Sequence, residues 1–359
     1  FSSTYSTLSL CKYGAQLQCA NSMNKEQSII LKGIAVLFMV WGHLFGRNTD
    51  LYSDVFYIFG KPFAQFICGG MSPVAFFLMI GGYGLYNVYL KGYDKNRYKR
   101  IFRLYLHYWI VLIIFVPIGY FFVNEERYPG SFYDVILNLI GLSTSYNSEC
   151  WFLLPYSLVS LSSAFLFRIY DRFNAKTLIA ITFSIHLLTC TALHFYGETF
   201  INHNVWISLP LVFLHFQLSF SLGALLKREQ IFEKTKHFVK ERNIKTYQTL
   251  LLLLFVFLLM CSVWNTGYYS FYVMFFILSI SLLPMENIIG KTLAYIGKHS
   301  MNIWMTHTFF AYHLFKTYTY SLKFPVIIFL ATIAVSLLSS SIINFIVSFL
   351  KRHTFLPIT

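Results

Sequence analysis

Apolar runs of about twenty residues recur along most of this 359-residue chain, and they limit what it can fold into. The runs lack the strict alternation of barrel strands, and their length suits a helix that crosses a lipid bilayer. Backbone groups in lipid must hydrogen-bond internally, which a helix achieves within one segment. The sequence therefore predicts an all-α fold, a polytopic transmembrane helical bundle.

Charge supports the same interpretation. Charged residues make up 12% of the chain, whereas a soluble domain carries about 25%. The net charge of +14 comes from basic residues in the loops between apolar runs, where cytoplasmic loops collect Lys and Arg. We therefore expect membrane lipids and an anionic cytoplasmic ligand as partners, and no nucleic acid.

The loop charges also predict the topology. We expect ten spans, near 28–47, 70–90, 103–123, 150–169, 176–196, 205–226, 247–263, 266–284, 301–319 and 324–350. A shorter apolar stretch, 131–146, is expected to form a re-entrant or interfacial helix. If it does not cross, the basic loops 91–103 and 227–245 lie on one side, and both termini are cytoplasmic. We expect the chain in a plasma membrane, the inner membrane of a bacterium.

Residues 1–22 differ from the rest, because they hold Ser, Thr and Cys without a clear span. Met23 resembles a natural start. We therefore expect a non-native or disordered leader over 1–22, followed by one transmembrane domain over 23–359.

Two ionisable residues in the first span are candidates for function, because such residues are costly in lipid. Lys32 and His43 are eleven residues apart, so they share one helix face and lie about 16 Å apart along its axis. A neutral imidazole suits proton transfer from an alcohol. A snorkelling Lys and a hydrogen-bonded structural His explain the same pattern.

Two further motifs carry candidate site residues. Arg100 and Arg103 share a helix face at the start of the third span, where paired guanidinium groups suit a pyrophosphate. Simple anchoring of the span end is the alternative. Within the block 295–307, Gly297 is expected to end a short helix and Ser300 to cap the next, which places His307 inside a span.

The cysteines and the remaining histidines show no site pattern. The six cysteines lack a CxxC pair, so we interpret them as small hydrophobic residues and expect no metal. The histidines in or beside spans without a partner motif are expected to be structural: His107, His186, His194 and His215.

Several motifs together resemble acyltransferase family 3, and they occur in family order over residues 28 to about 320. The basic residue, ten-residue gap and His of that family resemble Lys32 to His43, and its Arg-x-x-Arg motif resembles Arg100 to Arg103. Further similar segments are Pro73–Gly82, Trp151–Leu153, Phe220–Gly223 and Gly297–His307.

The resemblance implies an integral membrane O-acyltransferase. It would transfer an acyl group, most often acetyl, from cytoplasmic acyl-CoA to a hydroxyl of a cell-surface glycan or its lipid-linked precursor. His43 would be the catalytic residue, as general base or transient acyl carrier, with His307 as a second catalytic candidate. Arg100 and Arg103 would bind the phosphates of acetyl-CoA, with Lys32 as a third cation.

Two departures from the family pattern concern the binding residues. Lys32 stands where Arg is more common, and it lacks the bidentate guanidinium. Some members carry an acid shortly after the Trp, where Pro155 and Tyr156 stand here. Glu149, just before Trp151, is the nearest carboxylate, and we take both as candidate substrate-binding residues.

Two other functions remain open from the sequence. A polytopic exporter of a carbohydrate or lipid-linked carbohydrate is the main alternative, and it would favour paired half-bundles. A glycan polymerase or ligase would be expected to have a large basic outer loop. The chain shows no clear internal repeat and short outer loops, so both are less favoured than acyl transfer.

Overall fold

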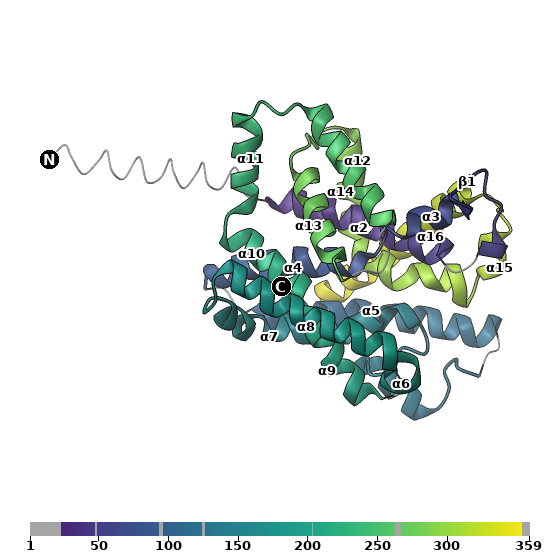
Figure 1. The fold of residues 1–359 in the computed structure, drawn as a ribbon. Helices are drawn as coiled ribbons and strands as arrows, with labels where there is room; N and C mark the ends of the chain where they lie inside the picture. Colours follow the sequence, from purple (N-terminus) through teal and green to yellow (C-terminus); the bar gives the residue numbers. More distant parts are fainter. Residues whose placement is uncertain are drawn as a thin grey trace.

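The computed structural model describes residues 23–46, 49–92, 96–123, 126–202, 204–262 and 267–353. The predicted leader over 1–22 lies outside this part of the chain. The described residues form a helical bundle with one short β-hairpin, in which Tyr57 pairs with Pro62 and Ile58 with Lys61 (Figure 1). The start of α2 and helix α11 lie at one end of the bundle, and β1 and α15 lie at the other.

The long helices are α2 (Lys25–Phe45), α4 (Pro73–Leu90), α5 (Arg97–Phe122), α7 (Leu153–Tyr170), α8 (Ala175–Tyr196), α14 (Ile288–Thr308) and α16 (Pro325–His353). The shorter ones are α3 (Phe63–Cys68), α6 (Phe132–Ile140), α9 (Val205–His215), α10 (Gln217–Arg228), α11 (Ile231–Glu241), α12 (Thr246–Ser262), α13 (Tyr269–Ser281) and α15 (Lys316–Tyr320). Single turns are η1 (Thr49–Leu51), η3 (Ser148–Phe152), η4 (Gly197–Ile201) and η5 (Phe309–His313), and the strands are β1 (Tyr57–Ile58) and β2 (Lys61–Pro62).

The prediction of a polytopic, all-α membrane bundle is confirmed. Seven segments of the described chain are long and apolar enough to cross a membrane: Lys25–Phe45, Phe63–Leu90, Arg97–Phe122, Ser148–Tyr170, Ala175–Ile201, Val205–Arg228 and Pro325–His353. Two of the other three predicted spans fall on α12 and α13, which are apolar but shorter. The third, 301–319, is not one helix, because it runs from the end of α14 through η5 into α15. The count of ten spans therefore stays a prediction.

The stretch 131–146 contains only the nine-residue helix α6, about 14 Å long, which is too short to cross a bilayer. Its C-terminal carbonyls accept hydrogen bonds from aromatic side chains of α5. Tyr108 donates to the carbonyl of Asn138 at 2.9 Å, and Trp109 donates to that of Leu139 at 2.9 Å. The bond to Leu139 satisfies a carbonyl that the helix end leaves unpaired, whereas the Asn138 carbonyl also accepts from the Gly141 backbone N–H at 3.0 Å.

The prediction that Gly297 ends a helix and Ser300 caps the next one is wrong. Helix α14 continues unbroken through both residues. Gly297 instead lies where α14 crosses α2: a Cβ at Gly297 would be 1.9 Å from the carbonyl oxygen of Ile29, and one at Gly33 would be 2.1 Å from that of Leu293. Two glycines therefore allow the two backbones to approach closely.

A second glycine contact joins α4 to α10. A Cβ at Gly82 would lie 2.2 Å from the carbonyl oxygen of Phe220, and one at Gly223 would lie 2.1 Å from that of Met79. The segments that resemble family motifs therefore include both close helix crossings.

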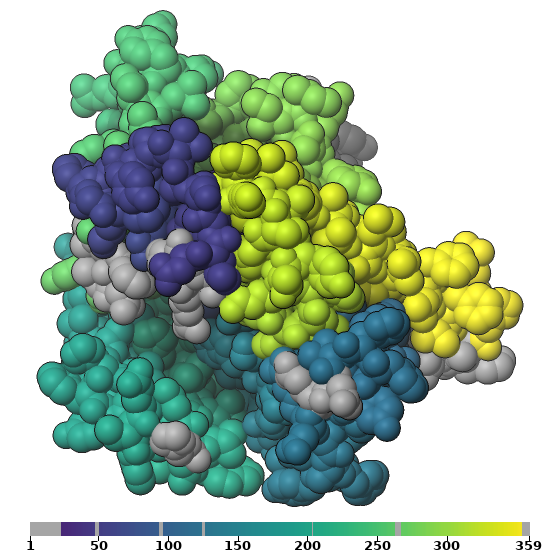
Figure 2. All heavy atoms as spheres, turned by 90° about the vertical axis from the view of Figure 1, so that its right-hand side faces the viewer, coloured from purple at the N-terminus to yellow at the C-terminus, as the bar shows by residue number. Residues whose placement is uncertain are grey.

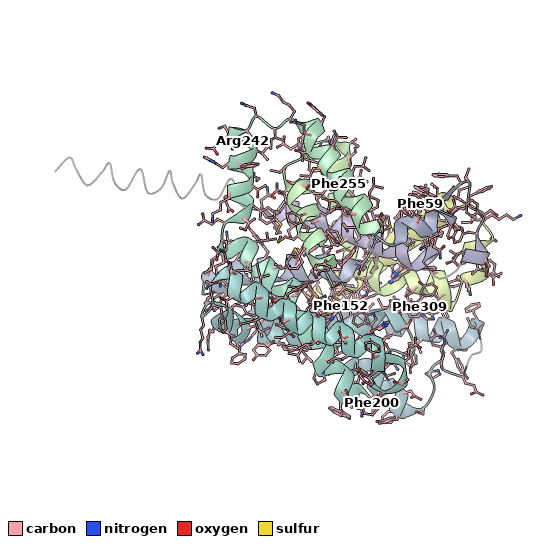
Figure 3. All side chains as sticks on the ribbon, viewed as in Figure 1. Phe59, Phe152, Phe200, Arg242, Phe255 and Phe309 are labelled. Atoms are coloured by element: carbon pink, nitrogen blue, oxygen red, sulfur yellow. The ribbon has the colours of Figure 1, made fainter. Side chains whose placement is uncertain are left out.

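Side-chain burial separates the core from an apolar outer surface. Phe309 is fully buried and Phe152 is nearly so, and both lie inside the bundle (Figure 3). Phe59, Phe200 and Phe255 point away from it and are more than half exposed. Exposed apolar side chains on this scale suit contact with lipid.

The end of the bundle with β1 and α15 is built from segments that are distant in sequence (Figure 2). Ser53 donates its backbone N–H to the carbonyl of Lys323 at 2.8 Å, and the Tyr320 hydroxyl donates to that of Leu44 at 2.6 Å. These bonds fix the C-terminal end of α2, where His43 lies.

Candidate active site

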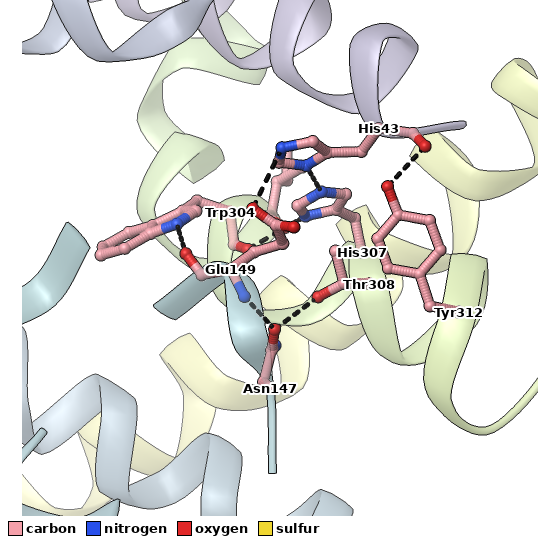
Figure 4. Close-up of polar contacts among 8 residues, drawn as sticks. His43, Asn147, Glu149, Trp304, His307, Thr308 and Tyr312 are labelled. Atoms are coloured by element: carbon pink, nitrogen blue, oxygen red, sulfur yellow. Dashed lines mark hydrogen bonds and ion pairs between the residues drawn. The ribbon is translucent and has the colours of Figure 1, made fainter. Parts of the chain in front are cut away.

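Helices α2 and α14 bring two histidines together. From the Gly33–Gly297 contact, each helix continues for ten residues, about 15 Å, to His43 and His307. His43 Nδ1 lies 2.8 Å from His307 Nε2, and the rings are parallel within 8° (Figure 4). His307 is fully buried, whereas the His43 side chain is 23% exposed.

Hydrogen bonding determines which ring nitrogens carry protons. His307 Nδ1 lies 2.9 Å from the carbonyl oxygen of Ile303 and 3.0 Å from that of Trp304. A carbonyl only accepts, so Nδ1 of His307 donates, and Nε2 of the neutral ring accepts a hydrogen bond from the Nδ1–H of His43. His43 therefore uses Nδ1 for the contact with His307, and its Nε2 is left for a different partner.

Glu149 completes the cluster. Its Oε2 lies 3.2 Å from His43 Nε2, and its side chain is 15% exposed. One proton occupies this contact, since two unprotonated atoms would repel each other. The pair is then either an imidazolium with a carboxylate or a neutral imidazole with a carboxylic acid. Both forms are neutral as a pair, which limits the cost of placing them in a bilayer.

Residues that were not among the predicted site residues hold Glu149 in place. Asn147 Oδ1 accepts from the Glu149 backbone N–H at 3.2 Å and from the Thr308 hydroxyl at 2.7 Å. Asn147 Nδ2 donates to the carbonyl of Met305 at 2.9 Å, and Trp304 Nε1 donates to that of Glu149 at 2.9 Å. The η3 turn is thereby tied to α14.

The backbone of His43 is also held. The Tyr312 hydroxyl, from η5, donates to the carbonyl of His43 at 2.5 Å (Figure 4). Asn147, Trp304, Thr308 and Tyr312 have no spacing relation to His43 in the sequence. Three of them lie near a predicted site residue in the sequence, since Asn147 precedes Glu149 by two residues and Trp304 and Thr308 lie within three residues of His307.

A cavity of about 790 Å³ opens beside the cluster. Five of the seven predicted site residues line it: Lys32, His43, Arg100, Glu149 and Trp151. His307 lies behind His43, fully buried. Arg103 does not line the cavity, and its side chain is exposed. Within the described residues, Lys32 and Arg100 are the only Lys or Arg side chains in the lining.

The cavity follows α2 over much of its length. Its lining includes Ser28 and Gly46, which are about 27 Å apart along a helix axis. The hydrocarbon core of a bilayer is about 30 Å thick. Lys32, Arg100 and the His43–Glu149 pair therefore lie along one continuous cavity whose length is close to that thickness.

Aromatic side chains form part of the wall near Glu149. Trp151 is 40% exposed, and its ring centroid lies 6.0 Å from that of Phe152 and 6.1 Å from that of Phe216.

Comparison with known proteins supports the resemblance. A family model described as an acyltransferase domain matches residues 27–345, nearly the whole chain, from the first turn of α2 into α16. No curated protein and no solved structure matches the chain. The matched segment contains both histidines of the cluster and Glu149. The chain is therefore a membrane acyltransferase that belongs to acyltransferase family 3.

Proposed function

We propose that this chain is an O-acyltransferase that transfers acetyl from cytoplasmic acetyl-CoA to a hydroxyl of a cell-surface glycan or a lipid-linked glycan precursor. The observation that carries the proposal is that Lys32, Arg100 and the His43–Glu149 pair all line the same cavity. This combination provides both anion binding and proton transfer in one space.

Lys32 and Arg100 provide the binding site for the phosphates of the acyl donor. Acetyl-CoA carries its phosphates at one end and its thioester at the other, joined by a long pantetheine arm. Lys32 precedes His43 by about 16 Å along α2, and Arg100 lines the same cavity. Phosphates bound by Lys32 and Arg100 would direct the arm along the cavity toward His43.

The histidine–carboxylate pair accounts for the chemistry. The acceptor hydroxyl oxygen attacks the thioester carbonyl carbon, and its proton moves to the His43–Glu149 pair. When the carbon–sulfur bond breaks, the pair returns the proton to the departing CoA thiolate. The products are the O-acetyl ester and CoA, and the cluster regains its original proton count. His307 holds His43 in the tautomer that presents Nε2 to Glu149.

The acceptor side is assigned from topology and aromatic residues. With the basic loops inside, the C-terminal half of α2 and the η3 turn face the outer leaflet. Trp151 is the exposed aromatic residue beside Glu149, and indole rings stack well on sugar faces. A hydroxyl of a glycan seated on Trp151 would lie near the proton-accepting pair.

Reconstituted transfer tests the proposal. Purified protein in proteoliposomes is given labelled acetyl-CoA inside and a panel of glycans outside, and glycan-bound label is counted. The parent is expected to transfer label, and His43→Ala to lose it. His194→Ala, an exposed histidine at the end of α8, is the matched control and should transfer normally. Transfer by His43→Ala at the parental rate contradicts the catalytic assignment, and glycan movement without acylation favours an exporter.

A further inference from the structure

A second pair of histidine rings meets between α8 and α9, away from the cavity. His186 of α8 and His215, the last residue of α9, have ring centroids 4.3 Å apart. Cys190 follows His186 by one helical turn and points to the same pair. Its Sγ lies 3.6 Å from His186 Nε2 and 3.9 Å from His215 Nδ1. None of the three residues lines the cavity beside His43.

The three ligand atoms have the spacing of a metal site. In tetrahedral zinc coordination, with Zn–S of about 2.3 Å and Zn–N of about 2.0 Å, sulfur and nitrogen lie about 3.5 Å apart. The two sulfur–nitrogen distances here are 3.6 and 3.9 Å, and all three ligand atoms lie within 4.8 Å of one another. Two nitrogens on a tetrahedral zinc lie about 3.3 Å apart, so the two imidazole rings would rotate toward each other on binding. Across the part of the chain that the structure describes, this is the one such group.

Neighbouring hydrogen bonds orient the ligands. His186 Nδ1 lies 3.1 Å from the carbonyl oxygen of His215, so Nδ1 donates and the lone pair of Nε2 faces Cys190. A zinc-bound histidine usually donates its second nitrogen to a carbonyl in this way. Thr189 Oγ1 donates to the carbonyl of His186 at 2.8 Å and lies 3.1 Å from His215 Nδ1. Metal binding at that nitrogen would displace the Thr189 hydroxyl and move the His215 proton to Nε2.

We propose that His186, Cys190 and His215 form a zinc site inside the bundle. A thiolate with two imidazoles selects a borderline metal such as zinc over magnesium or calcium, which prefer oxygen ligands. Binding releases the Cys190 proton, because the metal binds the thiolate. Three protein ligands leave the fourth zinc position for water. The sequence had suggested structural histidines and no metal.

The ion would link α8 to the junction between α9 and α10. His215 ends α9 and Gln217 begins α10, with Phe216 between them. The ring centroid of Phe216 lies 6.1 Å from that of Trp151 and 5.4 Å from that of Phe152, both in the cavity wall. Zinc between α8 and His215 would therefore stiffen the support of that wall. This inference does not depend on the proposed acyl transfer.

Cobalt is the probe for the experiment, since Co²⁺ bound to a thiolate absorbs in the near ultraviolet. The purified full chain in detergent is titrated with Co²⁺ and then with Zn²⁺. We expect one Co²⁺ per chain, a thiolate-to-metal absorption band, and loss of the band when Zn²⁺ is added. Cys190→Ser should remove the band, and His215→Gln should weaken Co²⁺ binding at least tenfold. Matched controls that should keep it are Cys261→Ser, His194→Gln and the double change of Cys11 and Cys19 to Ser.

A second measurement needs no variant. Alkylation of each cysteine in the parent protein is followed by peptide mass spectrometry with and without Zn²⁺. We expect Zn²⁺ to slow the alkylation of Cys190 at least tenfold and to leave that of Cys68 unchanged. No cobalt band in the parent, an undiminished band in Cys190→Ser, or alkylation of Cys190 that Zn²⁺ does not change would each overturn the proposal.

Discussion

The bundle contains two pairs of touching histidines, and the third residue of each cluster differs. His43 and His307, between α2 and α14, meet the carboxylate of Glu149. His186 and His215, between α8 and α9, meet the thiol of Cys190. In both clusters one ring nitrogen donates to a backbone carbonyl, which fixes the tautomer. The third residue then decides whether the pair shares a proton or binds a metal.

The two clusters also differ in whether a substrate can reach them. The Glu149 cluster borders a cavity of about 790 Å³ with two cations in its lining, so a charged substrate can reach it. The residues of the Cys190 cluster do not line that cavity and lie between α8 and α9. A pair of histidines in a membrane bundle is therefore uninformative alone, and access and the third ligand define its chemistry.

The largest expected effect comes from removing the proton acceptor of the first cluster. Glu149→Gln keeps the side-chain shape but cannot exchange a proton with His43, so kcat for acyl transfer should fall by about 10²–10⁴-fold. Initial rates at saturating acetyl-CoA provide the measurement. Glu198→Gln, an exposed acid on η4, is the control. A Glu149→Gln enzyme within twofold of the parent would remove Glu149 from the chemistry.

The next effect separates the two arginines of the Arg-x-x-Arg motif. Arg100 lines the cavity and Arg103 does not. Loss of one charge-assisted hydrogen bond costs about 1.5–3 kcal/mol, so Arg100→Ala should raise KM for acetyl-CoA by about 10–150-fold. Arg103→Ala should change it much less. Equal increases for the two variants would show that the donor lies outside the cavity described here.

A smaller effect is expected when the helices of the first cluster are forced apart. Gly33→Ala places a methyl group against the carbonyl of Leu293, which should destabilise the protein by about 1–3 kcal/mol. Gly84→Ala, whose Cβ would meet open space, is the control for stability. Thermal unfolding in detergent compares the two. The cobalt band of Gly33→Ala should persist, because α2 and α14 do not contribute to the second cluster.

The smallest expected effect is on metal affinity and concerns Thr189, which contacts the proposed zinc ligands. Thr189→Val removes the hydroxyl that contacts His215 and donates to the carbonyl of His186. The hydroxyl contacts His215 Nδ1, the nitrogen that would bind the metal, so it competes with the ion, and its loss should strengthen Co²⁺ binding by about two- to tenfold. Thr191→Val, whose hydroxyl donates to the carbonyl of Leu187 on the same helix, is the control. Identical affinities for the two variants would mean that Thr189 does not compete with the metal for His215 Nδ1.

Features that depend on residues close together in the sequence were predicted well. The helical class, the family and the non-crossing stretch 131–146 follow from the length of apolar runs and from ordered motifs, which are local properties. The role of Gly297 was not predictable in this way. A glycine marks a helix end and a close helix crossing equally well, and only the position of α2 shows that the second applies.

The site was predicted in part for a similar reason. Lys32 and His43 lie on one helix, so their spacing was sufficient to relate them. The contact between His43 and Glu149 joins residues that are far apart in sequence, and no spacing rule connects them. The same holds for His215 beside Cys190, although Cys190 follows His186 at a spacing that places both on one helix face.

The most direct test of the distinction between the two clusters is one variant with two readouts. In His43→Asn, acyl transfer from labelled acetyl-CoA and the Co²⁺–thiolate absorption are measured on the same preparation. The account predicts that transfer falls by at least about 10²-fold while the cobalt band keeps its parental intensity. Transfer at the parental rate, or loss of the cobalt band together with transfer, would contradict it.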